Sequence, residues 1–267
     1  MPILVISSIK KLYICFLQDL KLRVAISGEL CYNLGYAIYK GEVFLMKKVT
    51  IITGHYGSGK TNICANLAME LAKNGEKVTV VDLDIVNPYF RTADFSDLFK
   101  DNNITLVSSI YANSNLDIPA ISFDVERLCR EDGYVIIDVG GDDAGATALG
   151  RYKAVFEELY EENKIDMLYV INCCRYLTRT PKEALELMYE IEYTARFKHT
   201  GIINNSNLGN ETTLETAVSS IEFETAVSGE AKLPVLFTSV CKGCDIPEIE
   251  GVNFREVDVF VKPLWEL

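Results

Sequence analysis

The chain has 267 residues, of which 49% are hydrophobic and 24% charged. This is enough for one large core, or for a compact domain with an appendage, and it excludes a disordered or fibrous protein. Acidic residues outnumber basic ones by 38 to 26, so the field of the folded chain should repel nucleic acid and anionic membranes. We therefore expect no direct nucleic acid partner.

The eight cysteines show neither the regular spacing of a disulfide framework nor an accompanying secretory leader. We interpret them as reduced thiols of a cytoplasmic protein. The apolar runs near the start, ILVI and LYICFL, are far shorter than the roughly 20 residues that span a bilayer. We therefore expect no membrane span.

The first 45 residues differ in charge from the rest of the chain. They hold five basic and three acidic residues (net +2), against 21 basic and 35 acidic residues (net −14) in 46–267. Lys40-Gly41-Glu42 can be encoded by a purine run that resembles a ribosome-binding site ahead of a start codon for Met46. We therefore expect a domain at 46–267, preceded by a segment 1–45 that is either an over-extended gene prediction or a real N-terminal extension.

A glycine-rich loop follows the first apolar run of this domain, VTIIT (49–53). Gly54-His55-Tyr56-Gly57-Ser58-Gly59-Lys60-Thr61 matches G-x-x-x-x-G-K-[ST], and Asn62 opens a segment of helical periodicity. Glycines let backbone N–H groups curl around phosphate oxygens, and a helix N-terminus adds its positive dipole end. We predict that residues 54–62 bind the phosphates of a nucleotide, with Lys60 on the β- and γ-phosphates and Thr61 on Mg²⁺.

Carboxylates follow two of the later apolar runs. KVTVVDLD (77–84) ends with Asp82 and Asp84, and YVIIDVGG (134–141) contains Asp138 before Gly141. In a doubly wound sheet, ligands bind beyond the carboxyl ends of the strands, so these groups should converge on the loop. We expect Asp138 and Asp82 at the Mg²⁺, Gly141 as a backbone donor to the γ-phosphate, and Asp84 to orient or activate the attacking water. For each aspartate, a helix cap or a turn is the structural alternative.

Two asparagine motifs compete for the nucleotide base. Asn163-Lys164-Ile165-Asp166 matches the guanine-reading N-K-x-D of G proteins, but it precedes the apolar run MLYVIN (167–172) instead of following it. We therefore interpret it as a helix-to-strand turn, at the sheet edge away from the phosphates. Asn205, with Asn204 as its neighbour, ends TGIINN (200–205) on the ligand side; a turn-forming pair is the alternative.

The stretch NCCRYLTRT also lies on the predicted ligand side, because it follows MLYVI. Arg175 could contact phosphate or an effector, although a surface arginine is an equal alternative. Cys173 and Cys174 are adjacent at a strand end, where free thiols are commonly buried and inert.

The apolar runs together predict the fold class. These seven runs, which also include ITLVSS (104–109) and LPVLFTSV (233–240), lack the strict polar alternation of half-exposed strands. Between them, Thr180-Pro181-Lys182-Glu183 and Thr212-Thr213-Leu214-Glu215 fit capping boxes that start helices. We predict one α/β domain with a doubly wound, mostly parallel sheet and helices on both faces, as in P-loop NTPases.

Several motifs of this domain together resemble a known protein family. GHYGSGKT, DLD followed by Pro88, and DVGG together resemble the MinD/ParA/Mrp branch of P-loop ATPases, over roughly Lys47 to Val240. DLDIVNPYFRT, IDVGGDDAGATALGRY and GIINNSNLGNETT resemble a group of uncharacterised bacterial proteins with a CobQ/CobB/MinD/ParA nucleotide-binding domain. The resemblance implies ATP, Mg²⁺ and often a nucleotide-dependent homodimer, and it makes Asn205 the reader of adenine.

The loop departs from this family at two positions. Dimerising relatives read G-K-G-G-x-G-K-T, with an extra lysine that crosses to the partner's phosphates, whereas this chain has His55 and Tyr56. Histidine has an ordinary pKa of about 6.5 and is only partly charged near neutrality. We therefore expect Mg-ATP binding to carry over, but not lysine-driven, dimer-dependent hydrolysis.

We expect a cytoplasmic ATPase that works as a nucleotide-dependent switch with slow hydrolysis and a protein partner that the sequence does not identify. One alternative is an ATP-dependent small-molecule enzyme, like the dethiobiotin synthetase and cobyrinate amidation relatives of this fold. Another is a nucleotide-gated iron–sulfur carrier or assembly factor, because Mrp-type relatives hold a cluster with a late C-x-x-C and this chain has Cys241-Lys242-Gly243-Cys244.

Overall fold

The computed structural model describes residues 37–39, 42–44, 46–83, 96–108, 125–141 and 143–260. Contacts divide the chain into two units, Met1–Leu45 and Met46–Leu267. In the first unit, strand β1 (Ala37–Tyr39) pairs in antiparallel fashion with β2 (Glu42–Phe44). The second unit contains the sheet and helices described below.

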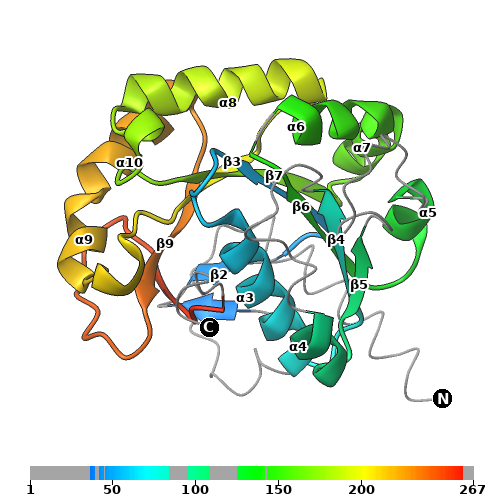
Figure 1. Ribbon diagram of the computed structural model, residues 1–267, viewed down its shortest axis with the longest axis horizontal. Coiled ribbons are helices and arrows are strands. Elements are labelled where there is room, and N and C mark those ends of the chain that lie inside the picture. The colour runs from blue at the N-terminus through cyan, green and yellow to red at the C-terminus, as the bar shows by residue number, and fades with distance from the viewer. Residues whose placement is uncertain are drawn as a thin grey trace, which may run out of the picture. The chain divides into compact units, whose positions relative to one another are not determined.

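The sheet of the second unit has eight strands in the order β10-β9-β8-β7-β3-β6-β4-β5, and every pairing is parallel. From β3 the chain moves to β4 and β5 on one side, and then returns through β6 to the strands on the other side (Figure 1). The predicted fold class is confirmed. The strands are β3 (Val49–Gly54), β4 (Val78–Leu83), β5 (Thr105–Ser108), β6 (Tyr134–Val139), β7 (Ile165–Ile171), β8 (Gly201–Asn204), β9 (Val235–Cys241) and β10 (Phe254–Val257).

Helices cover both faces of this sheet. Figure 1 shows α3 and α4 on one face and α6, α7 and α8 on the other. Strands β3 and β4 are buried at every position, which explains why their sequences lack polar alternation. The helices are α3 (Lys60–Lys73), α4 (Ser96–Asp101), α5 (Val125–Arg130), α6 (Asp143–Leu149), α7 (Lys153–Glu161), α8 (Pro181–Ala195), α9 (Leu214–Ser219) and α10 (Ile221–Ala231), with single turns η2 (Gly150–Tyr152), η3 (Tyr176–Thr178) and η4 (Gly209–Glu211).

The hydrophobic core on the α6–α8 face has two parts. One part packs Ile51 and Ile137 of the sheet against Phe156 of α7. The other packs Tyr169 of β7 against Leu185 of α8, and the Tyr169 hydroxyl donates to the carbonyl oxygen of Ala184 at 2.9 Å. Because strands and helices alternate along the chain, each apolar run is covered by a helix close to it in sequence.

The sequence predicts three helix ends, and the structure has two of them where they were predicted. Helix α3 ends before Gly75, whose φ of +78° closes the helix with bonds from the Gly75 and Glu76 N–H groups back to the last turn. Helix α8 starts with the predicted box between Thr180 and Glu183. The second predicted box is wrong by one residue, because Thr213 and not Thr212 caps α9.

Thr212 is used elsewhere. Its hydroxyl donates to the carbonyl oxygen of Gly209 at 2.5 Å and accepts from the N–H of Leu208 at 2.9 Å. These bonds close the turn before α9, so the next residue, Thr213, caps the helix.

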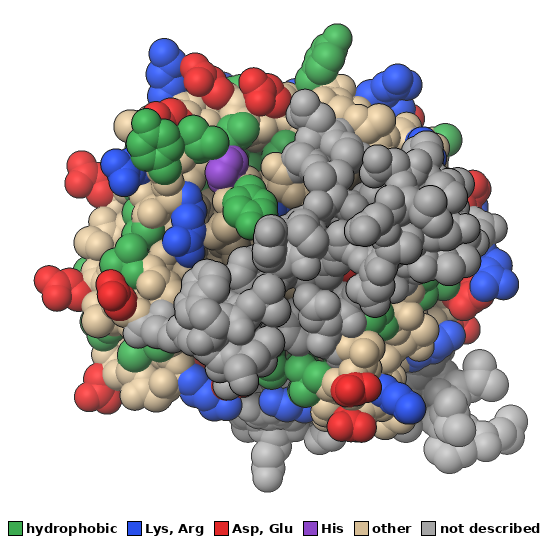
Figure 2. All heavy atoms as spheres, viewed as in Figure 1, with side chains coloured by type: hydrophobic (Ala, Val, Ile, Leu, Met, Phe, Trp, Pro, Cys, Tyr) green, Lys and Arg blue, Asp and Glu red, His purple; other side chains and the backbone are tan. Residues whose placement is uncertain are grey.

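Figure 2 shows that basic and acidic side chains are interspersed over the described part of the visible face.

Candidate functional site

The loop from Gly54 to Gly59 joins β3 to α3 at the carboxyl edge of the sheet. Gly57 and Gly59 have φ of +76° and +89°, a left-handed conformation that strains other residues. The N–H of Ser58 donates to the carbonyl oxygen of His55 at 3.1 Å and closes a turn within the loop. Since the residue before α3 is a glycine, no side chain caps the first amides of the helix. Such a loop ahead of a helix is suited to an anion.

Three carbonyl oxygens of the loop are held by side chains. Lys60 Nζ donates to the oxygen of His55 at 3.1 Å, and Asn205 Nδ2 donates to that of Ser58 at 2.8 Å. Arg175 Nε donates to the oxygen of Gly57 at 2.7 Å. With these carbonyls tied, the loop is held in one conformation by groups from α3 and from the ends of β7 and β8.

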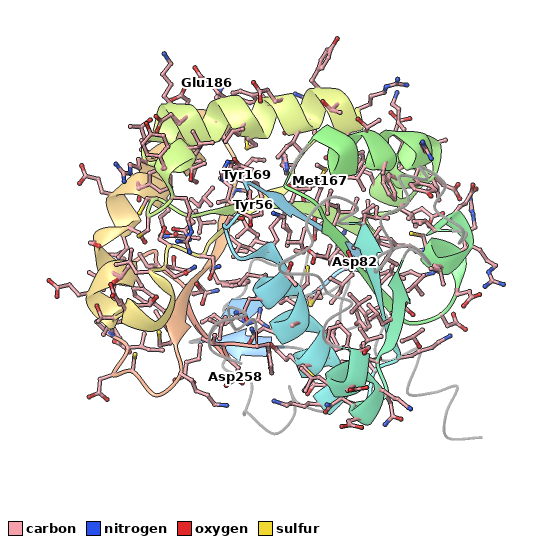
Figure 3. The ribbon with its side chains drawn as sticks, viewed as in Figure 1. Tyr56, Asp82, Met167, Tyr169, Glu186 and Asp258 are labelled. Carbon is pink, nitrogen blue, oxygen red and sulfur yellow. The ribbon has the colours of Figure 1, made fainter. Side chains whose placement is uncertain are left out.

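A hydroxyl and a carboxylate meet where α3 begins. Thr61 Oγ1 donates to Oδ2 of Asp138 at 2.8 Å, and Asp138 is only 1% exposed. Asp82, also buried, is the direct partner of Asp138 in the register of β4 with β6. Figure 3 shows Asp82 on β4 and Tyr56 at the end of β3. The structure thus brings Thr61 and Asp138 into contact and places Asp82 beside Asp138 on the neighbouring strand.

The donor set fits a magnesium ion that is held jointly with a ligand. Mg²⁺ prefers oxygen donors, and it usually binds one or two carboxylates together with phosphate oxygens and water. In the ranges given above, no three His, Cys, Asp or Glu side chains gather as a metal site. Thr61, Asp138 and Asp82 are the residues that would hold Mg²⁺ together with a nucleotide.

Gly141 lies against the loop on the side of Lys60. A Cβ atom at this position would come within 2.6 Å of Tyr56 N and 2.9 Å of Lys60 Nζ. Only glycine fits this approach, so the backbone of Gly141 borders the same space as the lysine ammonium group. The backbone N–H of Gly141 is the group that we predict to donate to the γ-phosphate.

His55 and Tyr56 differ in exposure. Burial lowers the pKa of His55, and the nearby Lys60 charge lowers it further. A lowered pKa favours the neutral form of His55 near pH 7, which agrees with our interpretation that His55 cannot be assumed to serve as the cation that a lysine provides. Tyr56 is 50% exposed at the mouth of the loop.

The two asparagines after β8 have separate roles. Asn204 is completely buried, with Nδ2 donating to Ser220 and Glu224 and Oδ1 accepting from Ser206. Its amide has no capacity left for a base, so the structure assigns it a packing role in place of the base contact suggested by the sequence. Asn205 instead touches the loop, and its Oδ1 accepts from Ser239 Oγ at 2.5 Å.

Asp84 and Asn62 are the two remaining candidate residues. Asp84 lies outside the described residues. The side chain of Asn62 points to the C-terminal segment: its Nδ2 donates to the oxygen of Asp258 at 3.0 Å, and its Oδ1 accepts from the N–H of Phe260 at 2.8 Å. The Asn62 side chain is therefore engaged by the C-terminal segment.

The N-K-x-D sequence lies at the opposite edge of the sheet. Asp166 is at the start of β7, where it pairs with Lys47 at 3.0 Å and accepts from Thr200 Oγ1 at 2.8 Å. Asn163 has a left-handed φ of +56° in the turn between α7 and β7. Our interpretation of this sequence as a turn is confirmed.

Cys64, Cys241 and Cys244 are three of the six described cysteines. Cys64 is buried on α3, and burial together with the adjacent Asp138 raises its pKa well above the ordinary value. Cys241 is the last residue of β9 and Cys244 follows the strand; burial raises the pKa of Cys241, as does the nearby Cys244. No third metal ligand joins that pair in the part of the chain that the structure describes.

Sequence reasoning missed Ser239, Asn207 and Cys64 as neighbours of the loop. Ser239 orients Asn205, and Asn207 accepts from Arg175. Cys64 had a usable signal, because it lies one helical turn after Lys60 and so shares a face with it. Asn207 lies beyond the end of β8 and Ser239 lies within β9, both distant from the loop in sequence, and no motif pointed to either of them.

Comparisons with known proteins agree with this geometry. Residues 49–206, more than half of the chain, match the family described as CobQ/CobB/MinD/ParA nucleotide binding domain. A stretch of 72 residues, 27% of this chain, is 35% identical to the tyrosine-protein kinase YwqD of Bacillus subtilis and covers 29% of that protein.

Solved structures share the fold. FtsY from Mycoplasma mycoides matches with a TM-score of 0.51 and 20% identity, over 73% of this chain and 60% of that one. Chloroplast FtsY from Physcomitrella patens matches with a TM-score of 0.51 and 19% identity, over 77% and 63%. This chain thus spans less than two thirds of the length of these proteins. None of the described helices is long and apolar enough to cross a membrane.

Proposed function

Because this chain belongs to the CobQ/CobB/MinD/ParA nucleotide-binding domain family, we propose that it binds Mg-ATP at residues 54–62 and hydrolyses it slowly as a switch. The observation that carries the proposal is the 2.8 Å bond between Thr61 and Asp138 at the start of α3. It joins the helix that follows the glycine-rich loop to a buried carboxylate on β6. A hydroxyl and a carboxylate in this arrangement suit a nucleotide-bound Mg²⁺.

The chain's own residues would act mainly by position and charge. Lys60, which donates to His55 O, can turn its ammonium group toward phosphate oxygens inside the loop. The backbone of Gly141 borders the same space, so its N–H can donate to the terminal phosphate. Mg²⁺, when bound, would neutralise negative charge on the phosphates. Asp84 stays our proposed group for orienting the attacking water, on the basis of its place after β4.

The choice of adenine rests on Asn205. Ser239 and the Ser58 carbonyl fix its amide, so one N–H and one oxygen lone pair point in defined directions. An amide that offers one donor and one acceptor complements the N7 and N6 edge of adenine, whereas guanine presents two acceptors there. The N-K-x-D sequence, at the other edge of the sheet, does not compete for this role.

Hydrolysis in this proposal does not use a lysine from a second subunit. The family resemblance implies a homodimer, and we keep a nucleotide-dependent dimer as part of the proposal. However, burial lowers the pKa of His55, so position 55 brings no cation near neutral pH. We also propose a cytoplasmic location and a protein partner that senses the nucleotide state.

The test compares wild type with Lys60→Ala and Lys73→Ala. Lys73 is an exposed residue in the last turn of the same helix and serves as the matched control. Binding of ATP and GTP is measured by calorimetry with Mg²⁺, and phosphate release is followed over hours. We expect ATP binding in wild type and Lys73→Ala, a loss in Lys60→Ala, and weaker binding of GTP. Normal ATP binding and hydrolysis by Lys60→Ala would contradict the proposal.

A further inference from the structure

Arg175 reaches the phosphate loop from a different strand. It lies just after β7, yet its Nε donates to the carbonyl oxygen of Gly57 at 2.7 Å. Its Nη2 donates to Oδ1 of Asn207 at 3.1 Å. One guanidinium therefore joins three segments that are distant in sequence: the loop after β3, the turn after β7 and the turn after β8.

The acceptor on Asn207 is held in place by its own bonds. Its N–H donates to Oδ1 of the buried Asn172 at 3.3 Å, and its Nδ2 donates to the carbonyl oxygen of Asn205 at 2.7 Å. Since Nδ2 is used by a carbonyl, the amide oxygen must face Arg175. It also accepts from the N–H of Gly209 at 3.2 Å. Arg175 thus docks on a fixed acceptor and not on a mobile side chain.

The contact falls on a flexible point of the loop. Gly57 has a φ of +76°, and a Cβ atom there would lie 3.6 Å from both Cδ and Nε of Arg175. The arginine side chain therefore packs directly against the glycine backbone. Because glycine loses more conformational freedom on ordering than any other residue, an external bond at this residue has a large effect on the loop.

We propose that Arg175 is a positioning residue for phosphate binding, which holds the Gly57–Ser58 peptide in the conformation that receives the phosphates. This inference rests on the proposed nucleotide site but adds a residue outside the G-x-x-x-x-G-K-[ST] pattern. The bond from a guanidinium is charge-assisted and stronger than one between neutral groups. Arginine suits this positioning role better than lysine, because a lysine ammonium group cannot present two donors in a fixed planar fork. Without Arg175, the loop becomes ordered only when nucleotide binds, and the conformational entropy lost in that step weakens nucleotide binding.

The test measures binding of a fluorescent N-methylanthraniloyl ATP, in the presence of Mg²⁺, to wild type, Arg175→Ala, Arg175→Lys and Arg179→Ala. Arg179 is the matched control, because it is exposed and stacks over the Tyr176 ring at 5.3 Å in the same turn region. We expect Arg175→Ala to bind about tenfold more weakly, the loss of one hydrogen bond to a charged group. Arg175→Lys should fall between wild type and Arg175→Ala, and Arg179→Ala should match wild type.

Rescue separates a positioning role from a general loss of stability. Guanidinium ion at low millimolar concentration should restore part of the affinity of Arg175→Ala and leave wild type unchanged, because the cation can occupy the vacated place. Melting temperatures of all variants are measured in parallel. If Arg175→Ala does not fold, Arg175→Lys decides, and an affinity equal to wild type overturns the inference.

The outcomes also distinguish this inference from the proposed function. Wild-type binding together with unchanged binding by Arg175→Ala would overturn the role of Arg175 alone. An equal loss in Arg179→Ala would do the same, because the effect would then be general to the turn. A wild-type protein that binds no nucleotide would overturn the phosphate site, and this inference with it.

Discussion

The hydroxyl of Thr53, the last residue before the glycine-rich loop, lies 2.7 Å from Nε2 of His199, a buried histidine. On the other side of the ring, Nδ1 lies 3.1 Å from Oε1 of Glu192, which also accepts from the His199 N–H at 3.0 Å. A neutral ring that donates from Nδ1 and accepts at Nε2 satisfies both contacts. His199 and Glu192 thus connect the residue that precedes the loop to helix α8.

This anchor predicts a pH dependence of stability. Burial lowers the pKa of His199, so the folded protein keeps the ring neutral while the unfolded chain takes up a proton below about pH 6.5. Burial alone would raise the pKa of Glu192, but the hydrogen bonds from His199 outweigh this effect and the pKa is lowered. Both groups therefore lose stabilising free energy as the pH falls, His199 below about 6.5 and Glu192 below about 4.5.

Urea unfolding at several pH values checks this expectation. The unfolding free energy of wild type should fall between pH 7 and pH 5, and His199→Gln should be less stable at pH 7 but show a shallower fall. Equal slopes for the two proteins would mean that another group titrates in this range. His55 is half-buried with a lowered pKa as well, so His55→Gln serves as the control for its contribution.

Replacement of glycine by alanine should have opposite effects at Gly141 and at Gly229. Gly141→Ala places a Cβ atom 2.6 Å from the Tyr56 nitrogen, so the loop must shift and nucleotide binding should be lost. Gly229 lies in α10 with nothing within 4 Å of the added atom, so Gly229→Ala should stabilise the protein by about 0.5–1 kcal/mol. Thermal unfolding and nucleotide titration of both variants check the pair. Tight nucleotide binding by Gly141→Ala would show that Gly141 does not border the site.

Glu224 is a buried carboxyl group that should limit stability at neutral pH. It accepts from Asn204 Nδ2 at 2.6 Å and Thr238 Oγ1 at 2.5 Å, and burial raises its pKa. A raised pKa means that the folded state favours the protonated form, so stability falls as the pH rises through the folded value. Glu224→Gln should therefore be more stable than wild type at pH 8, by on the order of 1 kcal/mol, and lose this advantage near pH 4. A variant less stable than wild type at pH 8 would contradict this account.

The C-terminal segment after β10 is tied to α3 by two asparagines. Asn66 pairs with both backbone groups of Asp258 at 2.8 Å, and Asn62 bonds to Asp258 and Phe260. Asn66→Ala removes these two bonds and a third one, from Asn66 Nδ2 to the Asn62 carbonyl oxygen at 2.8 Å, and should lower the unfolding free energy by about 1–3 kcal/mol. Hydrogen exchange at Asp258 should become faster as well. Unchanged exchange at this amide would show that the segment is held by other contacts.

Much of the architecture follows from local sequence. The loop at Gly54, the apolar runs of β3 to β9 and the cap at Thr180 are short-range patterns, and the structure has each of them. Strand β10 was not predicted, because FREV alternates in polarity at the edge of the sheet and carries two charges. The second cap moved by one residue because Thr212 closes the preceding turn instead.

The site was predictable where a motif or the order of the parallel strands places a residue. The contacts of Thr61 with Asp138 follow from a motif and the parallel order of strands. By contrast, the contact of Arg175 with Gly57 joins residues 118 positions apart, and no spacing in the sequence encodes it. Asn204 and Asn205 are neighbours of one type, but successive strand residues face opposite sides of the sheet. One is therefore buried beside Glu224 and the other meets the loop.

The most direct test of the central claim is calorimetric titration of ATP into wild type and Asp138→Asn, each with Mg²⁺ and with EDTA. If Asp138 and Thr61 hold a nucleotide-bound Mg²⁺, wild type should bind ATP more tightly with Mg²⁺ than with EDTA. Asp138→Asn should lose most of this difference, and the two proteins should bind alike in EDTA. The same Mg²⁺ dependence in Asp138→Asn as in wild type, or no ATP binding by wild type, would contradict the account.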